Sequence, residues 1–255
     1  MNLLLFKLTL APLLVLGATL AGRKWGQTAA GLVAGFPIVA GPILFFFALE
    51  RGPVFAAGAA QATLLGLISL SFFALAYSWR AWSGGTVISC LLLSWVAFAF
   101  ATGLVQRAQD PGLLKSFLWA LLALFLAARS LPSFGESGEL GPPDRWDLPL
   151  RGISAAVLVL GLTHFAEALG PRLSGFLTPF PVASTVLAVF AHRQGAGAAA
   201  VAVLKGLLLA LNSFAVFCLV LCLTLPSHSV PASFGLALAA SAVLQALLFQ
   251  ATRKR

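Results

Sequence analysis

Long apolar runs recur along the whole chain, separated by short segments that carry charges, prolines or glycines. Each run is close to the roughly twenty residues that an α-helix needs to cross a bilayer. A β-barrel would instead show shorter segments of alternating polarity. The pattern therefore predicts an all-α polytopic membrane protein with about nine transmembrane helices, at 3–21, 29–49, 54–78, 86–105, 112–131, 151–169, 174–192, 198–224 and 232–251.

The composition agrees with this class of protein. Of the 255 residues, 60% are hydrophobic and only 9% are charged, whereas a soluble domain of this length needs a more charged surface. The net charge of +9 comes from single basic residues between the apolar runs and from the C-terminal ATRKR. No basic run is interleaved with aromatic residues, as a nucleic-acid-binding surface would show. We therefore expect these basic residues to contact membrane lipids and not nucleic acid.

One segment between the apolar runs is too polar to lie in a bilayer. It reads PSFGESGELGPPDRWDLP, from Pro132 to Pro149, and is rich in proline, glycine and acidic residues. It divides the chain into a first four-helix repeat at 1–109, a connecting helix at 110–131, a polar cytoplasmic linker at 132–150 and a second four-helix repeat at 151–255.

The two four-helix units are recognised as repeats by a constant offset of 144 positions. LVLGAT at 14–19 matches LVLGLT at 158–163, and GLVAGFP at 31–37 matches GFLTPFP at 175–181. Between Leu14 and Pro37, nine of 24 positions are identical to their counterparts, where composition alone accounts for roughly two or three. We therefore predict a duplicated unit, with spans one to four repeated as spans six to nine.

The fifth span has no counterpart, and a single extra helix between two even-numbered units inverts the second unit. Inverted repeats are typical of many secondary transporters. With nine spans, ten basic loop residues share the side of the C-terminus and five lie opposite, which by the positive-inside rule predicts a bacterial inner-membrane protein with its N-terminus outside and its C-terminus cytoplasmic. The ten are Arg23, Lys24, Arg80, Arg129, Arg145, Arg151, Arg193, Arg253, Lys254 and Arg255; the five are Lys7, Arg51, Arg107, Lys115 and Arg172.

Helix-breaking residues lie inside the second and seventh spans, which read AGFPIVAGP at 34–42 and TPFPVAST at 178–185. A proline removes a backbone donor, and lipid offers the freed carbonyl no partner. We predict two broken helices that cross at a substrate site, with a simple packing kink as the alternative. The predicted substrate-binding residues are Phe36, Pro37, Gly41, Thr178, Phe180, Pro181, Ser184, Thr185 and Asn212.

Two titratable residues of the sixth span carry a second hypothesis. His164 and Glu167 are three residues apart, so both project from one face of a helix. A neighbouring carboxylate raises the pKa of a histidine towards physiological pH, which would suit a proton relay. Alternatively, both side chains extend to the nearby membrane interface. Lys205 similarly either meets an anionic solute or extends to the interface along its own stem.

Several classes of function are disfavoured by what the sequence lacks. It has no Walker A, HExxH or GxSxG motif and no paired carboxylates within a span. We therefore expect no enzymatic activity, no metal and no cofactor. The predicted function is a secondary transporter of a small organic or anionic solute, with proton coupling as an option. An accessory membrane subunit and a lipid flippase are the alternatives, and a homodimer is allowed.

Overall fold

The computed structural model describes residues 3–37, 40–107, 111–134, 146–158, 160 and 181–253. Every regular element in these residues is a helix. Their bounds are α1 Leu3–Trp25, α2 Gln27–Ala34, α3 Ala40–Glu50, α4 Pro53–Trp82, α5 Val87–Arg107, α6 Leu113–Ser130, α8 Val182–Thr224 and α9 Val230–Arg253. A further helical segment covers 147–158.

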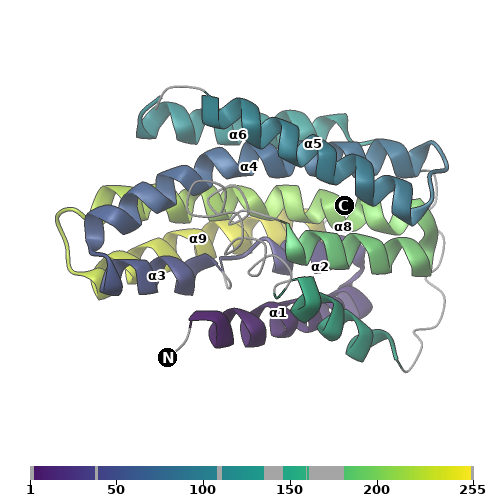
Figure 1. The fold of residues 1–255 in the computed structure, drawn as a ribbon, viewed down its shortest axis with the longest axis horizontal. Helices are drawn as coiled ribbons and strands as arrows, with labels where there is room; N and C mark the ends of the chain where they lie inside the picture. The colour runs from purple at the N-terminus through teal and green to yellow at the C-terminus, as the bar shows by residue number, and fades with distance from the viewer. Residues whose placement is uncertain are drawn as a thin grey trace.

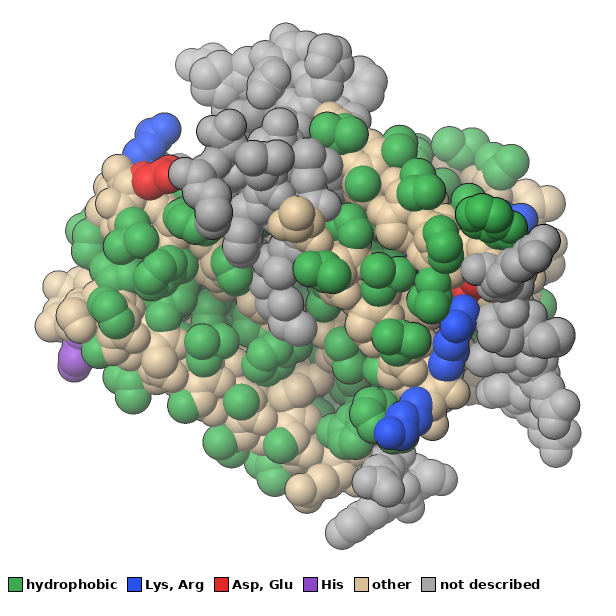
Figure 2. Space-filling view, turned by 90° about the horizontal axis from the view of Figure 1, so that it is seen from below, with side chains coloured by type: hydrophobic (Ala, Val, Ile, Leu, Met, Phe, Trp, Pro, Cys, Tyr) green, Lys and Arg blue, Asp and Glu red, His purple; other side chains and the backbone are tan. Residues whose placement is uncertain are grey.

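The helices form a bundle in which α5 and α6 lie on one side, α1 lies on the opposite side, and α8 runs between them (Figure 1). Five of the described helices are long and apolar enough to cross a membrane: α4, α5, α6, α8 and residues Val230–Gln250 of α9. The prediction of a helical, multi-pass membrane protein is therefore confirmed at this level. Much of the face drawn in Figure 2 is hydrophobic, with most of its charged side chains towards the left and right ends.

Helix α8 consists of two parts. Gly195 (φ −136°, ψ 28°) and Ala196 (φ 54°, ψ −162°) have non-helical backbone and separate 182–194 from 197–224. Val186, Leu187 and Ala191 of the first part share a core cluster with Ala199 and Val203 of the second part, so the chain folds back on itself here. The sequence predicted two spans, at 174–192 and 198–224, on either side of this turn.

Several helix boundaries recur at the offset found in the sequence. Helix α3 ends at Glu50 and the first part of α8 ends at Gln194, 144 positions later. The next helix starts at Pro53 in one case and at Gly197 in the other. The intervening residues Gly52 and Ala196 both have positive φ, at 92° and 54°. The helical segment 147–158 starts four residues earlier than the predicted sixth span.

Five segments that border the predicted spans meet at one end of the bundle, which we call the loop end. They are the α1–α2 junction, the α4–α5 turn, the stretch after α6, the turn within α8 and the end of α9. These are the segments that nine alternating spans would place on one side. The contacts that join them include Arg23 with Asp147, Trp79 with Ser130, Tyr77 with His192, and Trp25 with Phe249.

The most extensive packing between helices joins α2 to α8. A Cβ atom added at Gly31 would overlap the carbonyl oxygen of Val203 and lie 2.5 Å from the amide nitrogen of Leu207. A Cβ atom at Gly206 would overlap the carbonyl oxygen of Thr28 in return. The two backbones therefore touch, which is the geometry that small residues four apart permit between membrane helices.

This crossing gives a prediction about folding. Replacing Gly31 or Gly206 with alanine puts a methyl group into backbone that cannot move aside, and overpacking of this kind costs about 1–3 kcal/mol or more. We expect each variant to unfold at a clearly lower temperature in detergent. Gly58 and Gly103 have no atom within 4 Å of an added Cβ. Their alanine variants are the controls, and equal melting temperatures across all four variants would contradict the crossing.

Candidate functional site

The residues of the predicted second span form two short helices, α2 and α3, and residues 35–37 lie outside both. The amide of Gly35 donates to the carbonyl of Gly31 at 3.0 Å, and the amide of Phe36 donates to that of Val33 at 3.3 Å. A helix that ends inside a membrane leaves further carbonyls without an amide partner. The groups that satisfy or surround this α2 end define the candidate site.

Gln245 of α9 provides one of the missing donors. Its Nε2 donates to the carbonyl of Leu32 at 2.8 Å. Its Oε1 lies 2.7 Å from the hydroxyl of Ser213 in α8, and that hydroxyl also lies 2.7 Å from the carbonyl of Ala210. A serine hydroxyl carries a single proton, so it can donate to only one of these two oxygens at a time. The end of α2 is thus linked to α9 and α8 by side-chain hydrogen bonds.

Asn212, which precedes Ser213, offers an acceptor next to this link. Its Nδ2 donates to the carbonyls of Leu208 at 3.1 Å and Leu209 at 3.0 Å within its own helix. The described part of the chain gives its Oδ1 no donor, and the side chain is half-buried. We call Asn212, Ser213 and Gln245 the polar cluster.

The polar cluster lies near the middle of a span. Ser213 is 16 residues beyond Gly197, or about 24 Å along an α-helix, in a part of α8 that is about 40 Å long. Hydrogen-bonding groups at this depth are uncommon in membrane helices and mark sites of function more often than surface groups do. Gln245 and Ser213 are engaged in hydrogen bonds within the protein, so Oδ1 of Asn212 is the acceptor that the polar cluster still offers.

The start of α8 contributes less polar surface than the sequence predicted. Pro181 precedes the helix, and its carbonyl accepts the amide of Thr185 at 2.8 Å. The indole Nε1 of Trp95 in α5 lies 3.3 Å from the Thr185 hydroxyl and donates to it. Ser184 and Thr185 are both buried, at 5% and 3% exposure. Thr185 therefore ties α8 to α5 within the packed bundle.

The regions beside the two predicted breaks contact one apolar cluster. Val33 and Ala34, which precede the α2 end, pack against it, and so do Val182 and Ala183, which follow Pro181. Pro37 and Gly41 are buried beyond the α2 end, and an added Cβ at Gly41 would lie 3.5 Å from the ring of Phe217. Four predicted site residues lie outside the described residues: Thr178, Phe180, His164 and Glu167.

The sequence interpretation missed Gln245 and Trp95. A single glutamine inside the apolar run FGLALAASAVLQALLF is a detectable signal, because an amide side chain in a span needs a partner. The partner itself is a backbone carbonyl far away in the chain, and no spacing rule predicts that contact. Trp95 had no signal, since a tryptophan in an apolar run is ordinary.

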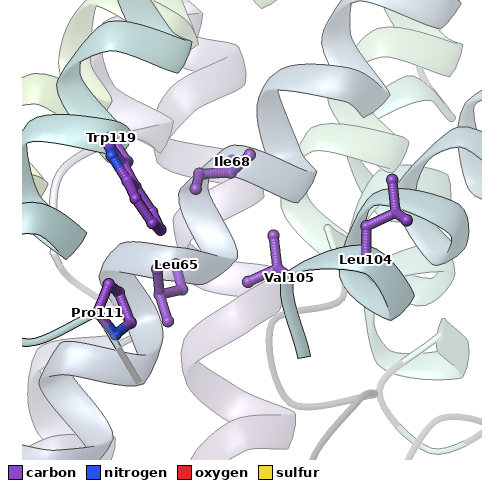
Figure 3. A pocket seen from close by; sticks show the side chains of 6 residues that line it. All are labelled: Leu65, Ile68, Leu104, Val105, Pro111 and Trp119. Atoms are coloured by element: carbon purple, nitrogen blue, oxygen red, sulfur yellow. The ribbon is translucent and has the colours of Figure 1, made fainter. Parts of the chain in front are cut away.

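The described residues contain a cavity of about 220 Å³ at a different place. It is lined by Leu65 and Ile68 of α4, Leu104 and Val105 of α5, Pro111 just before α6, and Trp119 of α6 (Figure 3). Its walls are apolar, and none of the described site residues predicted from the sequence lines it. A cavity on this outer helix face suits a lipid chain better than a polar solute. No three His, Cys, Asp or Glu side chains of the described residues lie close enough together to hold a metal ion.

A second polar group lies at the loop end. A guanidinium nitrogen of Arg23 is 2.8 Å from Oδ2 of Asp147, and Nε of Arg151 is 3.0 Å from both carboxylate oxygens. Arg151 also donates to Oε1 of Gln194 at 3.1 Å, and its guanidinium lies 4.9 Å from the ring centroid of Phe190. Arg23, Asp147, Arg151 and Gln194 form what we call the Asp147 network.

The carboxylate of Asp147 is charged in this network. Burial alone would raise its pKa, but the hydrogen bonds and charge of Arg151, with further hydrogen bonds from Arg23 and Gln194, outweigh burial. The pKa of Asp147 is therefore held below its ordinary value. Asp147 and Arg151 are only 5% and 3% exposed, so each charge depends on the other for its stability.

Comparison of the chain with protein-family models, curated proteins and solved structures finds no match. The assignment of function therefore depends on the two polar groups and the helices that hold them.

The lowered pKa of Asp147 predicts how stability depends on pH. Its stabilising contribution is fully present above the pKa of an unfolded aspartate, about 3.9, and is lost as the pH falls through the lower folded value. We expect Asp147→Asn to reduce stability by about 3 kcal/mol, equally at pH 8 and pH 5. The difference should shrink only below about pH 4. A difference that disappears between pH 7 and pH 5, measured by thermal unfolding, would contradict a lowered pKa.

Proposed function

We propose that this protein is a secondary transporter of a small organic or anionic solute, and that the solute binds where the end of α2 meets the polar cluster. The observation that carries the proposal is the hydrogen bond from Gln245 to the carbonyl of Leu32, beside Ser213 and Asn212, near the middle of the second part of α8. Irregular backbone at this depth is tolerated where it is buried in protein or lines a polar cavity.

An inverted repeat supports a carrier over a static subunit. The repeat is inferred from the sequence matches at an offset of 144 and from the helix boundaries at Glu50 and Gln194 that follow the same offset. Helix α6 stands between the two units without a counterpart, which would invert the second unit. The α2–α8 crossing joins one unit to the other, and carriers of this kind place their sites at such a contact.

The solute class follows from the groups at the proposed site. The donors and acceptors there are amide and hydroxyl groups, together with backbone freed around Pro37. These groups suit a small polar solute better than a metal ion. His164 and Glu167 remain the proposed proton relay, and Thr178 and Phe180 remain proposed parts of the site. The accessory-subunit and flippase hypotheses remain the alternatives.

The proposed topology has the loop end in the cytoplasm. Ten of the basic loop residues belong to the segments predicted on this side, and cytoplasmic loops of membrane proteins carry such an excess. Reporter fusions after Arg255 should therefore report a cytoplasmic location, and fusions at Pro111 an external one. If both fusions report the same side, the number of spans between these positions is even. That result would contradict the inverted arrangement of the two units.

Transport itself is testable in proteoliposomes. We expect uptake of at least one radiolabelled solute from a set that contains lactate, phosphate, glutamate and alanine, measured with and without a pH gradient. Asn212→Leu and Gln245→Leu each remove a hydrogen-bonding side chain, which is worth about 1–1.5 kcal/mol, or about tenfold in rate. Pro37→Ala should have a similar effect, because alanine favours a continuous helix.

The matched control is Gln250→Leu, in the same helix as Gln245 but exposed. It should leave uptake and melting temperature unchanged. Uptake that persists at the parent rate in Asn212→Leu, Gln245→Leu and Pro37→Ala would exclude the proposed site. Lipid scrambling by the same liposomes in the absence of solute uptake would favour the flippase hypothesis instead.

A further inference from the structure

The described residues contain two ion pairs, and the carboxylate of Asp147 takes part in both. This distinguishes the Asp147 network from the other polar contacts in this part of the chain. One pair joins Asp147 to Arg151 within the segment 147–158, and the other joins it to Arg23 at the end of α1. Charges as buried as those of Asp147 and Arg151 persist only when they are paired and hydrogen-bonded. The network is therefore a specific, tightly satisfied contact and not a solvated surface pair.

The network holds three separate elements together at the loop end. Arg23 comes from α1, Asp147 and Arg151 come from the segment 147–158, and Gln194 comes from the last turn of the first part of α8. The same turn of α8 reaches α4, because Nδ1 of His192 lies 3.3 Å from the hydroxyl of Tyr77. The first part of α8 thus connects the α1 side of the bundle to the α4 side.

The opposite end of the bundle is held by different contacts. Phe45 packs edge-to-face on Phe234 with ring centroids 5.1 Å apart, and Phe47 packs on Phe55 at 5.5 Å. The thiol of Cys222 lies 3.2 Å from the carbonyl of Ala57. No ion pair joins the described residues there. Edge-to-face aromatic pairs have a preferred geometry, but each adds only about 0.5–1.5 kcal/mol, whereas breaking a buried ion pair leaves a charge without its partner and costs about 3–5 kcal/mol.

We infer that the Asp147 network is the gate that closes the loop end of the protein, and that the structure is the state in which this gate is shut. The inference rests on the proposed carrier function, in which the central site must open to each side in turn. When the gate opens, water enters and solvates Arg23, Asp147 and Arg151, so their separation does not leave buried charges unpaired. The closed and open arrangements are therefore two discrete states, with no stable intermediate between them.

Removal of one partner should shift the balance to the open state. With Asp147→Asn, the guanidinium of Arg151 would remain buried with no counter-charge. The open state lowers the cost of this unpaired charge, because water solvates Arg151 there. Arg23→Gln removes the weaker, part-exposed pair and perturbs the fold less, so it serves as the second variant. Arg129→Gln is the control, since Arg129 is exposed at the same end and lies outside the network.

Distances between pairs of spin labels can test this gate in lipid nanodiscs. In the full chain with its three cysteines replaced by alanine, one pair is placed at Lys24→Cys and Arg193→Cys, which are exposed and adjoin Arg23 of α1 and Gln194 of α8 in the sequence. A second pair at Val54→Cys and Ser227→Cys reports on the opposite end. We expect the parent to show one short distance at the loop end. In Asp147→Asn and Arg23→Gln, a longer distance should increase about tenfold in population.

The outcomes separate the gate from the carrier. A longer loop-end distance in both variants, with the control unchanged, supports the gate. If the opposite-end distance shortens in the same samples, the carrier proposal is supported as well. If it stays fixed and no solute of the uptake set is transported, the gate stands and the carrier proposal fails. Folded variants that keep the parent distance at the loop end would overturn the gate and leave the uptake result unaffected.

Discussion

The contact between Gly31 and Gly206 determines how closely the two halves of the chain can approach. With no Cβ on either residue, the backbone of α2 lies directly on the backbone of α8. Gly35 extends the contact by one turn, since an added Cβ there would overlap that of Ala210 and lie 3.1 Å from the carbonyl of Leu207. Lipid provides no hydrophobic force between helices, so this close van der Waals packing is what holds them.

The same crossing explains the position of the polar cluster. Because α2 ends one turn after Gly31, its end lies beside the stretch of α8 that directly precedes Asn212, where an added Cβ at Gly35 would overlap that of Ala210. A carbonyl left alone at this depth would be costly, and Gln245 removes part of that cost by donating to Leu32. Packing and polarity therefore depend on each other here: larger residues at the glycines would separate the helices and leave the α2 end without its partners.

The helices were largely predictable from the sequence, because membrane spans are long apolar runs and the loops between them carry the charges. The predicted boundaries at 198–224 and 112–131 lie within a few residues of the second part of α8 and of α6. Gly35 and Pro37 weaken a helix in a recognisable way, and residues 35–37 lie outside α2 and α3. These are local properties, and a single sequence contains them.

Contacts between distant residues were less accessible. The sequence identified Asn212 but not Gln245, whose partner is more than two hundred residues away. It placed Asp147 in a polar cytoplasmic linker and gave it no partner, whereas the structure buries this carboxylate between two arginines. Nothing in the local pattern distinguishes an exposed aspartate from a paired one, because the pairing depends on how α1 and α8 meet. The polar groups on which the proposals rest are thus those that spacing rules reveal least.

The most direct test of this account is an experimental density map of the protein in lipid nanodiscs, at a resolution that shows side chains. We expect α2 to end near Ala34, Gly31 to lie against Gly206, and the Gln245 amide to contact the carbonyl of Leu32. We also expect additional density beside Asn212 when a transported solute is present. A continuous helix through 27–50, or an α2 end surrounded only by apolar side chains, would contradict the central claim that this crossing forms a binding site.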